Sequence, residues 1–323
     1  MRKCVGVLLV VCLMASSAFA TNSWTASTGS WGSPPGSANA NWRNSTTSIV
    51  PDNTEQVKIL AGKICTLDVT TVSFTTQKVT VGTAAAVGEL DIVNGGTLTS
   101  GVEMQVGDAS GKNGKVVQTG GTVNLSGGTG NSKLEVGYKD GIGSYTISSG
   151  SIVGAPSISQ LLIGCSGSVS GGNGTFDVQG TGGSISAAYL YVACQSASAT
   201  YTGTANLAFE INGGVSAINA GSVYIDPQNY AAAVANLYVT QTGALPTGNI
   251  LLINNTGTSA VSGAFDNVAW GGTITLGGVA YTLTNTYIGG SDGLANDVAL
   301  IIPEPATIAL LGLGLLALRR NKK

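Results

Sequence analysis

The sequence of 323 residues contains no histidine, and only 9% of its residues are charged. The absence of histidine excludes Ser-His-Asp and Cys-His catalysis, histidine general bases and every metal site that needs an imidazole ligand. Low charge together with 43% hydrophobic residues excludes the disorder that is typical of highly charged chains. The 48 glycines keep no three-residue period, which excludes collagen. The composition therefore argues against most enzymes, and we expect no catalytic residue, no cofactor and no metal.

The first twenty residues have the pattern of a secretory signal peptide. Arg2 and Lys3 form a basic start, an apolar stretch follows, and Ala18 and Ala20 fit the small-x-small rule for signal peptidase. The apolar stretch is shorter than the ~20 residues that a transmembrane anchor requires. We therefore predict a signal peptide at residues 1–20, cleavage after Ala20, and an exported mature chain.

The last residues form a second processing signal in three parts. Pro303, Glu304 and Pro305 come first, an uninterrupted apolar segment covers residues 306–318, and Arg319 and Arg320 begin a basic end. The apolar segment is short for a stable transmembrane span, and the basic end favours a cytoplasmic position, which leaves the preceding chain outside. A buried terminal helix of a soluble domain is the alternative, but it would place four cations directly after a buried segment.

This tail resembles the PEP-CTERM sorting signal. The resemblance covers residues 302–323 and implies that exosortase, a membrane-embedded cysteine transpeptidase, recognises Pro303, Glu304 and Pro305 and cleaves near them. It also implies that residues 306–318 are a transient membrane anchor and that Arg319 and Arg320 are stop-transfer charges. We therefore expect exosortase and signal peptidase as partners during export, with a final location at the cell envelope surface or outside the cell.

The mature chain is acidic once both ends are removed. Of 14 Lys and Arg residues, two lie in the signal peptide and four in the tail, which leaves 14 − 2 − 4 = 8. Of 16 Asp and Glu residues only Glu304 is lost, so residues 21–302 carry 8 − 15 = −7. Nucleic-acid binding needs clustered Lys and Arg, and we expect none here.

The middle of the chain is an imperfect repeat with two parts. Its anchor is an apolar-x-apolar-Gly tetrapeptide, which ends at Gly82, Gly107, Gly137, Gly164 and, with alanine in place of glycine, Ala193. These positions are 25, 30, 27 and 29 residues apart, and Val223–Asp226 is a candidate sixth copy. After each anchor comes a second stretch of alternating apolar residues and a glycine-rich turn. Such periods are typical of solenoids, and such alternation is typical of β-strands.

We therefore predict an all-β fold, a parallel β-helix or solenoid with short capping regions at both ends. Stacked coils bury one continuous core, and Thr, Ser and Asn ladders avoid the repulsion of stacked like charges. A β-sandwich of short strands shares this composition and is the alternative. The expected domains are an N-terminal cap at 21–77, solenoid repeats at 78–226, a C-terminal β cap at 227–302 and the sorting signal at 303–323. Residues 231–236 are the one helix-leaning stretch.

The repeats, which run from Lys78 to Ala217, resemble the β-helical surface repeats of PEP-CTERM and autotransporter-like proteins. This resemblance implies a structural or adhesive surface role. A carbohydrate-binding or polysaccharide-degrading protein on the same scaffold is the alternative, and extracellular polysaccharide is then the partner. Tryptophans near the N-terminus fit either a cap over the open core or a sugar site. They are Trp24, Trp31 and Trp42.

Four acids on the second strands are candidates for a catalytic cluster: Glu89, Asp91, Asp177 and Glu210. Lys115 and Tyr145 occupy the matching place in the coils between them, so the pattern favours solvated surface acids. A glycine-aspartate segment from Gly289 has a faint likeness to a calcium-binding repeat, and a plain turn is the stronger interpretation.

Cys165 and Cys194 follow two consecutive anchors at the same distance, so we expect them to be stacked in neighbouring coils. Adjacent parallel strands lie ~4.8 Å apart, which is within the reach of a disulfide. The sequence leaves open whether Cys165 and Cys194 form a disulfide or stay reduced. Cys65 is expected to have no partner near the N-terminal cap.

Overall fold

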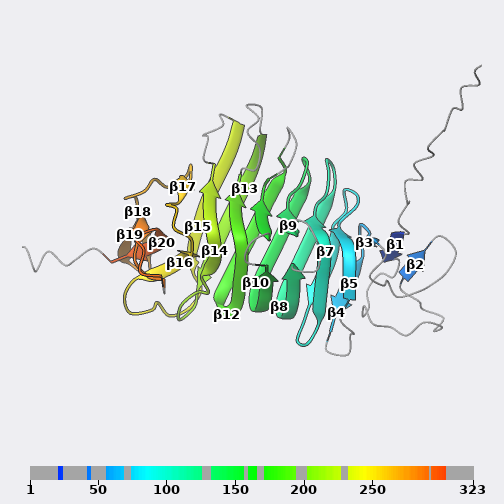
Figure 1. Cartoon of the computed structure of the whole chain (residues 1–323), viewed down its shortest axis with the longest axis horizontal. Helices are drawn as coiled ribbons and strands as arrows, with labels where there is room; N and C mark the ends of the chain where they lie inside the picture. Colours follow the sequence, from blue (N-terminus) through cyan, green and yellow to red (C-terminus); the bar gives the residue numbers. More distant parts are fainter. Residues whose placement is uncertain are drawn as a thin grey trace, which may run out of the picture.

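The computed structural model describes residues 21–24, 42–44, 56–68, 74–125, 132–155, 159–165, 171–193, 202–226, 232–290 and 292–302. Within those ranges the regular elements are 20 strands that form one hydrogen-bonded system, and there is no helix. The strands succeed one another along the long axis of the molecule, from β1 and β2 at one end to β18, β19 and β20 at the other (Figure 1). The prediction of an all-β parallel solenoid is confirmed.

The anchor tetrapeptides form the first of three parallel sheets. Its strands pair in order along the chain, with Val79 opposite Met104, Met104 opposite Leu134 and Leu134 opposite Leu161. The repeat register read from the anchors is therefore confirmed. The first sheet consists of β3 (Gln56–Ile59), the end of β5 (Phe74–Val81), the end of β7 (Thr97–Val106), β9 (Lys133–Val136), β11 (Gln160–Ile163), the end of β12 (Asn173–Val192), the end of β14 (Ile218–Ile225) and β17 (Ser262–Gly263).

The second stretch of each repeat forms the second sheet, again with parallel neighbours. It consists of β4 (Ile64–Leu67), β6 (Gly88–Ile92), the start of β8 (Asn113–Leu125), the start of β10 (Ile142–Gly154), the start of β12, β13 (Thr202–Ile211) and β15 (Ala232–Gln241).

A third parallel sheet was not expected from the two-part repeat. It is built from the segments that follow the glycine-rich turns, and it runs through the starts of β5 and β7, the ends of β8 and β10, the middle of β12, the start of β14, and β16 (Ile250–Asn255). Several of these segments continue without a break into a neighbouring sheet, as in β7 and β12. In these strands no turn motif marks the step from the third sheet to the first. The sequence pattern therefore merges the third strand with the strand that follows it.

The core lies between the three sheets and is made of inward columns of apolar side chains. Along the first sheet Val81, Val106, Val136 and Ile163 stack and are fully buried. Burial of a side chain of this size contributes about 1.5–3 kcal/mol. One coil cannot bury its own inward face, so this stabilisation depends on the stacking of neighbouring coils.

The anchor glycine turns the chain from the first sheet into the second. Gly137, for example, has φ +72°, a left-handed backbone that glycine adopts without steric cost. Ala193 and Asp226 take the same position in later coils and keep positive φ values of 53° and 36°. The corner geometry is therefore preserved where the glycine is lost.

Each end of the solenoid carries strands that are not part of the regular stack. At the N-terminal end β1 (Thr21–Trp24) pairs parallel with β3 and antiparallel with β2 (Trp42–Asn44). Trp24 is fully buried in the core, which agrees with a capping role. Trp31 and the side chain of Trp42 are not among the parts of the chain that the structure describes. At the other end β16, β19 (Val279–Tyr287) and β20 (Asp297–Ile301) pair antiparallel, with β18 (Thr273–Leu276) in a hairpin with β19.

The helix-leaning interpretation of residues 231–236 is wrong. Residues 232–236 begin β15, and Ala235 lies opposite Ala205 of β13. The alanines favour a helix locally, but Ala233, Ala235 and Leu237 point into the core, and this burial overrides the propensity. Among the residues that the structure describes, no helix is long and apolar enough to span a membrane.

The expected stacking of two cysteines is tested in part. Ile163 pairs with Val192, and the amide of Ala193 donates to the carbonyl of Ile163 at 3.0 Å, so the strands that lead to Cys165 and Cys194 are in register. Cys165 is buried, whereas Cys194 lies outside the described ranges, and a disulfide between them stays a prediction. Cys65 is a buried free cysteine that stacks on Leu90.

Candidate functional site

The predicted sorting residues all lie outside the part of the chain that the structure describes. Ala18 and Ala20 precede the described ranges, and residues 303–323, with Pro303, Glu304, Pro305, Arg319 and Arg320, follow them. The described solenoid offers instead the outward sides of its sheets, where every second residue of a strand points away from the core.

The four acids of the candidate cluster separate into two groups on the second sheet. Glu89 lies opposite Lys115, and their side chains form an ion pair at 2.8 Å. Asp91 lies two residues from Glu89 on the same strand, and partial burial and then the nearby Glu89 carboxylate raise its pKa. This group neutralises part of its own charge, as expected of a solvated surface.

Tyr145 does not occupy the outward place between the acids, and that part of the alignment is wrong. Tyr145 is fully buried, lies opposite Val116 and Phe176, and stacks its ring on Phe176 at 5.3 Å between centroids. Its hydroxyl donates to the Gln118 amide oxygen at 2.6 Å inside the core. The outward residue of that strand is Ser144, opposite Lys115.

The second group of acids lies three strands further along the same sheet. Gln179 donates to Oδ2 of Asp177 at 2.7 Å, and Glu210 lies opposite Gln179 on the next strand. Desolvation raises the pKa of Asp177, and desolvation followed by the Asp177 charge raises the pKa of Glu210. The second group has no ion pair with Lys or Arg among the described residues.

The glycine-aspartate segment after Gly289 uses its carboxylates to hold a turn. Asp297 is buried and accepts backbone N–H bonds from Asn255, Gly289 and Gly290 at 2.8–2.9 Å. Asp292 accepts from the amide of Leu294 at 3.0 Å. The turn interpretation is therefore favoured, and within the described ranges no group of three or more Cys, Asp or Glu side chains could hold a metal ion.

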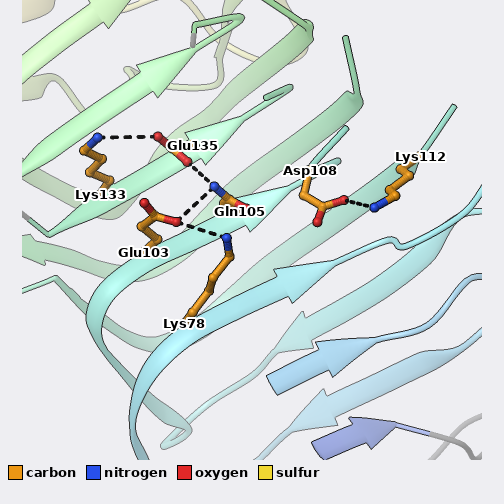
Figure 2. A network of polar contacts seen from close by, with 7 residues as sticks. All are labelled: Lys78, Glu103, Gln105, Asp108, Lys112, Lys133 and Glu135. Atoms are coloured by element: carbon orange, nitrogen blue, oxygen red, sulfur yellow. Dashed lines mark hydrogen bonds and ion pairs between the residues drawn. The ribbon is translucent and has the colours of Figure 1, made fainter. Parts of the chain in front are cut away.

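A polar network on the first sheet was not recognised from the sequence. Figure 2 shows Gln105 between two carboxylates: its amide donates to Glu135 at 2.6 Å and to Glu103 at 3.0 Å. Lys78 pairs with Glu103 at 3.2 Å, and Lys133 lies 3.8 Å from Glu135. The sequence does contain a signal for this network in the residue before each anchor. In three successive coils that residue is Lys78, Glu103 and Lys133, so opposite charges alternate along the stack. Opposite charges on neighbouring strands stabilise such a column.

Glu135 is the unusual member of this network because it points outward and is nevertheless buried, with 1% of its surface exposed. Desolvation raises its pKa to about 7, although the hydrogen bond from Gln105 and the charge of Lys133 act in the opposite direction. The group therefore binds a proton in the folded chain at a pH where it is ionised in the unfolded chain.

We expect Glu135→Gln to raise the stability of the protein at pH 8 and to have a smaller effect at pH 5. Because the folded pKa is above the unfolded one, the folded state binds more protons between about pH 4.5 and 7, and stability falls as pH rises through this window. The gain at pH 8 should be on the order of 1–3 kcal/mol. Urea unfolding at both pH values measures it. A variant that is equally destabilised at pH 5 and pH 8 would show that the ion pair with Lys133 outweighs the burial cost.

Beyond this network the first sheet carries stacked tyrosines. Tyr191 and Tyr224 lie opposite each other on β12 and β14, with ring centroids 5.0 Å apart and planes at 11°. Tyr189 stacks on Tyr191 at 6.0 Å. Their ring faces are directed at one another, so they form a ladder that covers the sheet.

Polar ladders cover parts of the other sheets. On the second sheet Asn236 donates to Asn206 at 3.0 Å, and Asn206 donates to Thr175 at 3.2 Å. On the third sheet Asn254 donates to Asn219 at 2.7 Å, and the hydroxyls of Thr122 and Ser151 lie 3.0 Å apart. Stacked coils with amide and hydroxyl ladders on their outward sides define the class of this molecule as a β-solenoid.

The comparisons with known proteins identify the tail. Residues 302–323 match the family model described as the PEP-CTERM protein-sorting motif. Comparisons of the chain with curated proteins and with solved structures found no match. The chain therefore carries a PEP-CTERM sorting motif at its C-terminal end, after a β-solenoid. The motif implies recognition by exosortase and export with membrane-associated sorting toward the cell envelope.

Proposed function

We propose that this protein has a structural or adhesive role at the cell surface or in the extracellular matrix, where it is delivered after exosortase has processed its tail. The observation that carries the proposal is the combination of an export motif with a capped solenoid whose outward sides hold amide, hydroxyl and tyrosine ladders. Such a surface is long and rigid and has its outward groups at the regular spacing of the strands. A strain without the protein should adhere less or form a weaker matrix, and unchanged adhesion and matrix strength would contradict the role.

We expect the mature protein to lack its basic end. The Pro303-Glu304-Pro305 motif is the recognition sequence in the resemblance, so exosortase should remove the residues that follow it. Intact-mass measurement of the surface or secreted form should show that Arg319 to Lys323 are missing. Replacement of all three motif residues by alanine should leave an unprocessed form in the membrane fraction. Recovery of the full C-terminus from mature wild-type protein would refute the prediction.

We also infer that the protein is not an enzyme, in contrast to the alternative of a polysaccharide-degrading solenoid. The chain has no histidine, Arg43 is the one arginine of residues 21–302, and the acids of the second sheet lie in two separate groups. Incubation of the purified protein with a panel of polysaccharides should therefore release no reducing ends or unsaturated products. Turnover that disappears in Asp177→Asn or Glu210→Gln would overturn this inference.

A further inference from the structure

On the outward side of the second sheet a small residue stands between larger ones, and we use the term depression for the place above this short side chain. On the central strand β13 this residue is Ala208, and Asp177 and Tyr238 lie directly opposite it on the two neighbouring strands. Strands in a sheet lie ~4.8 Å apart, so about 9.6 Å separates the backbones that carry Asp177 and Tyr238. Between them the side chain of Ala208 ends at its methyl group.

The other two borders of the depression come from the central strand itself. Asn206 and Glu210 lie two residues to either side of Ala208 and point to the same side of the sheet, because Leu207 and Phe209 are buried in the core. Asn206 is held in the amide ladder with Thr175 and Asn236. The depression therefore has an aromatic ring, a carboxylate, an amide and a second carboxylate around an apolar floor.

The groups around the floor have unused capacity for interaction. The Tyr238 side chain stands out from the sheet, with 48% of the residue exposed. Asp177 is partly exposed and Gln179 bonds its Oδ2, but no Lys or Arg among the described residues pairs with this carboxylate. A cationic group brought against the exposed part of the carboxylate would therefore be favourable.

The distribution of charge selects the ligand. Lys139 is the last Lys or Arg before the tail, so residues 140–302 carry no basic residue, whereas they carry seven acids. Residues 21–139 carry eight acids and all eight basic residues of the mature chain. The half of the solenoid that holds the depression is therefore uniformly negative, which attracts cationic ligands and repels anionic ones.

We propose that the depression over Ala208 binds a cationic amino sugar of an extracellular polysaccharide. The ring of Tyr238 packs against the apolar face of the sugar, the ammonium group is placed by Asp177 and Glu210, and the amide of Asn206 borders the hydroxyls. An apolar wall with a few polar groups that fix orientation is the usual composition of a ligand site. The proposal rests on the proposed surface role and names the partner of that role.

Calorimetric titration of the exported protein tests the site with three soluble oligosaccharides of equal length: a glucosamine oligomer, its fully N-acetylated form and an oligouronate. The glucosamine oligomer should bind at least about tenfold more tightly than the neutral oligomer, the oligouronate should not bind, and salt should weaken the binding. Equal binding of the cationic and neutral oligomers would overturn the role of charge. Absence of binding by the glucosamine oligomer would overturn the site.

Substitutions separate this site from general attraction to an acidic surface. Tyr238→Ala and Ala208→Leu leave the net charge unchanged, and each should weaken binding by about tenfold or more. Asp177→Asn should also weaken binding, whereas Asp292→Asn, an exposed acid in the same half, changes the charge equally and should have little effect. Tyr224→Ala on the first sheet is the control for loss of a tyrosine. Circular dichroism verifies that each variant is folded. Equal effects of Asp177→Asn and Asp292→Asn would overturn the proposal.

Two further measurements distinguish failure of the sugar site from failure of the proposed surface role. Calcium that binds with a dependence on Asp177, without any binding of the glucosamine oligomer, would identify a cation site and overturn the sugar proposal. Adhesion of cells that carry Tyr238→Ala is measured in parallel. If deletion of the protein reduces adhesion and Tyr238→Ala does not, the adhesive role stands and this site is refuted as its contact. If deletion has no effect while the oligomer binds, the site stands and the role is refuted.

Discussion

Gly137→Ala is expected to destabilise the solenoid by more than about 3 kcal/mol, a large fraction of the stability of a typical domain. Gly137 has a left-handed backbone at φ +72°, which costs a non-glycine residue about 1–2 kcal/mol. In addition, a β-carbon at this position would overlap the backbone of Asn173 and Gly174 in the next coil. Backbone atoms in the middle of a stacked sheet cannot move aside without breaking the ladder, so the clash adds to the conformational cost.

Gly180→Ala is the matched control for this prediction. Gly180 has a similar φ of +60°, but no atom lies within 4 Å of the position that a β-carbon would take. The control variant should lose about 1–2 kcal/mol, the conformational cost alone. Chemical unfolding of both variants gives the difference. Equal losses in the two variants would show that the close approach of neighbouring coils at Gly137 does not contribute to the change in the free energy of unfolding.

Replacing Asp266 and Asn267 together by alanine should make the protein associate into larger species than the wild type forms. Among the described strands β15 pairs with β13 and has no strand on its other edge. The backbone groups of that edge are occupied by these two residues. Asp266 accepts from the Ala235 amide at 2.6 Å and donates its own amide to the Ala235 carbonyl at 2.7 Å. The Asn267 side chain accepts from the Leu237 amide at 2.9 Å and donates to the Leu237 carbonyl at 2.8 Å.

Loss of these side chains would expose amide and carbonyl groups at a sheet edge, and such edges pair with other chains. We expect a loss of about 2–3 kcal/mol from the missing hydrogen bonds, in addition to association that increases with protein concentration. Size-exclusion chromatography with light scattering measures the association. Asp266→Asn keeps an acceptor beside Ala235 and should associate no more than the wild type. A double variant that associates no more than the wild type at high concentration would mean that the edge is protected by other parts of the chain.

Several features of the fold could be predicted because they are local or periodic. The anchor tetrapeptides gave the strands and register of the first sheet, since Val81, Val106 and Val136 recur before a glycine that permits the left-handed corner. The sorting motif at residues 302–323 is a contiguous signal and requires no tertiary contact for its recognition.

Other features could not be predicted because they depend on which residues become neighbours across a whole coil. No turn motif separates the third sheet from the first in β7 and β12, and Tyr145 was assigned to the outward side until its pairing with Val116 placed it in the core. The Gln105–Glu135 bond joins residues 30 positions apart. The length of each loop decides such pairings, and loops of this repeat differ in length from coil to coil.

The sequence by itself determined that the chain is an exported all-β solenoid, because hydrophobic alternation, glycine corners and terminal signals act over a few residues at a time. Only the tertiary structure decided what the outward sides present. It buried Glu135 beside Gln105, closed the free edge of β15 with Asp266 and Asn267, and placed Ala208 between Asp177 and Tyr238. The physical reason is that stacking brings together residues about 30 positions apart, and their burial, charge and shape are properties of the assembled sheet.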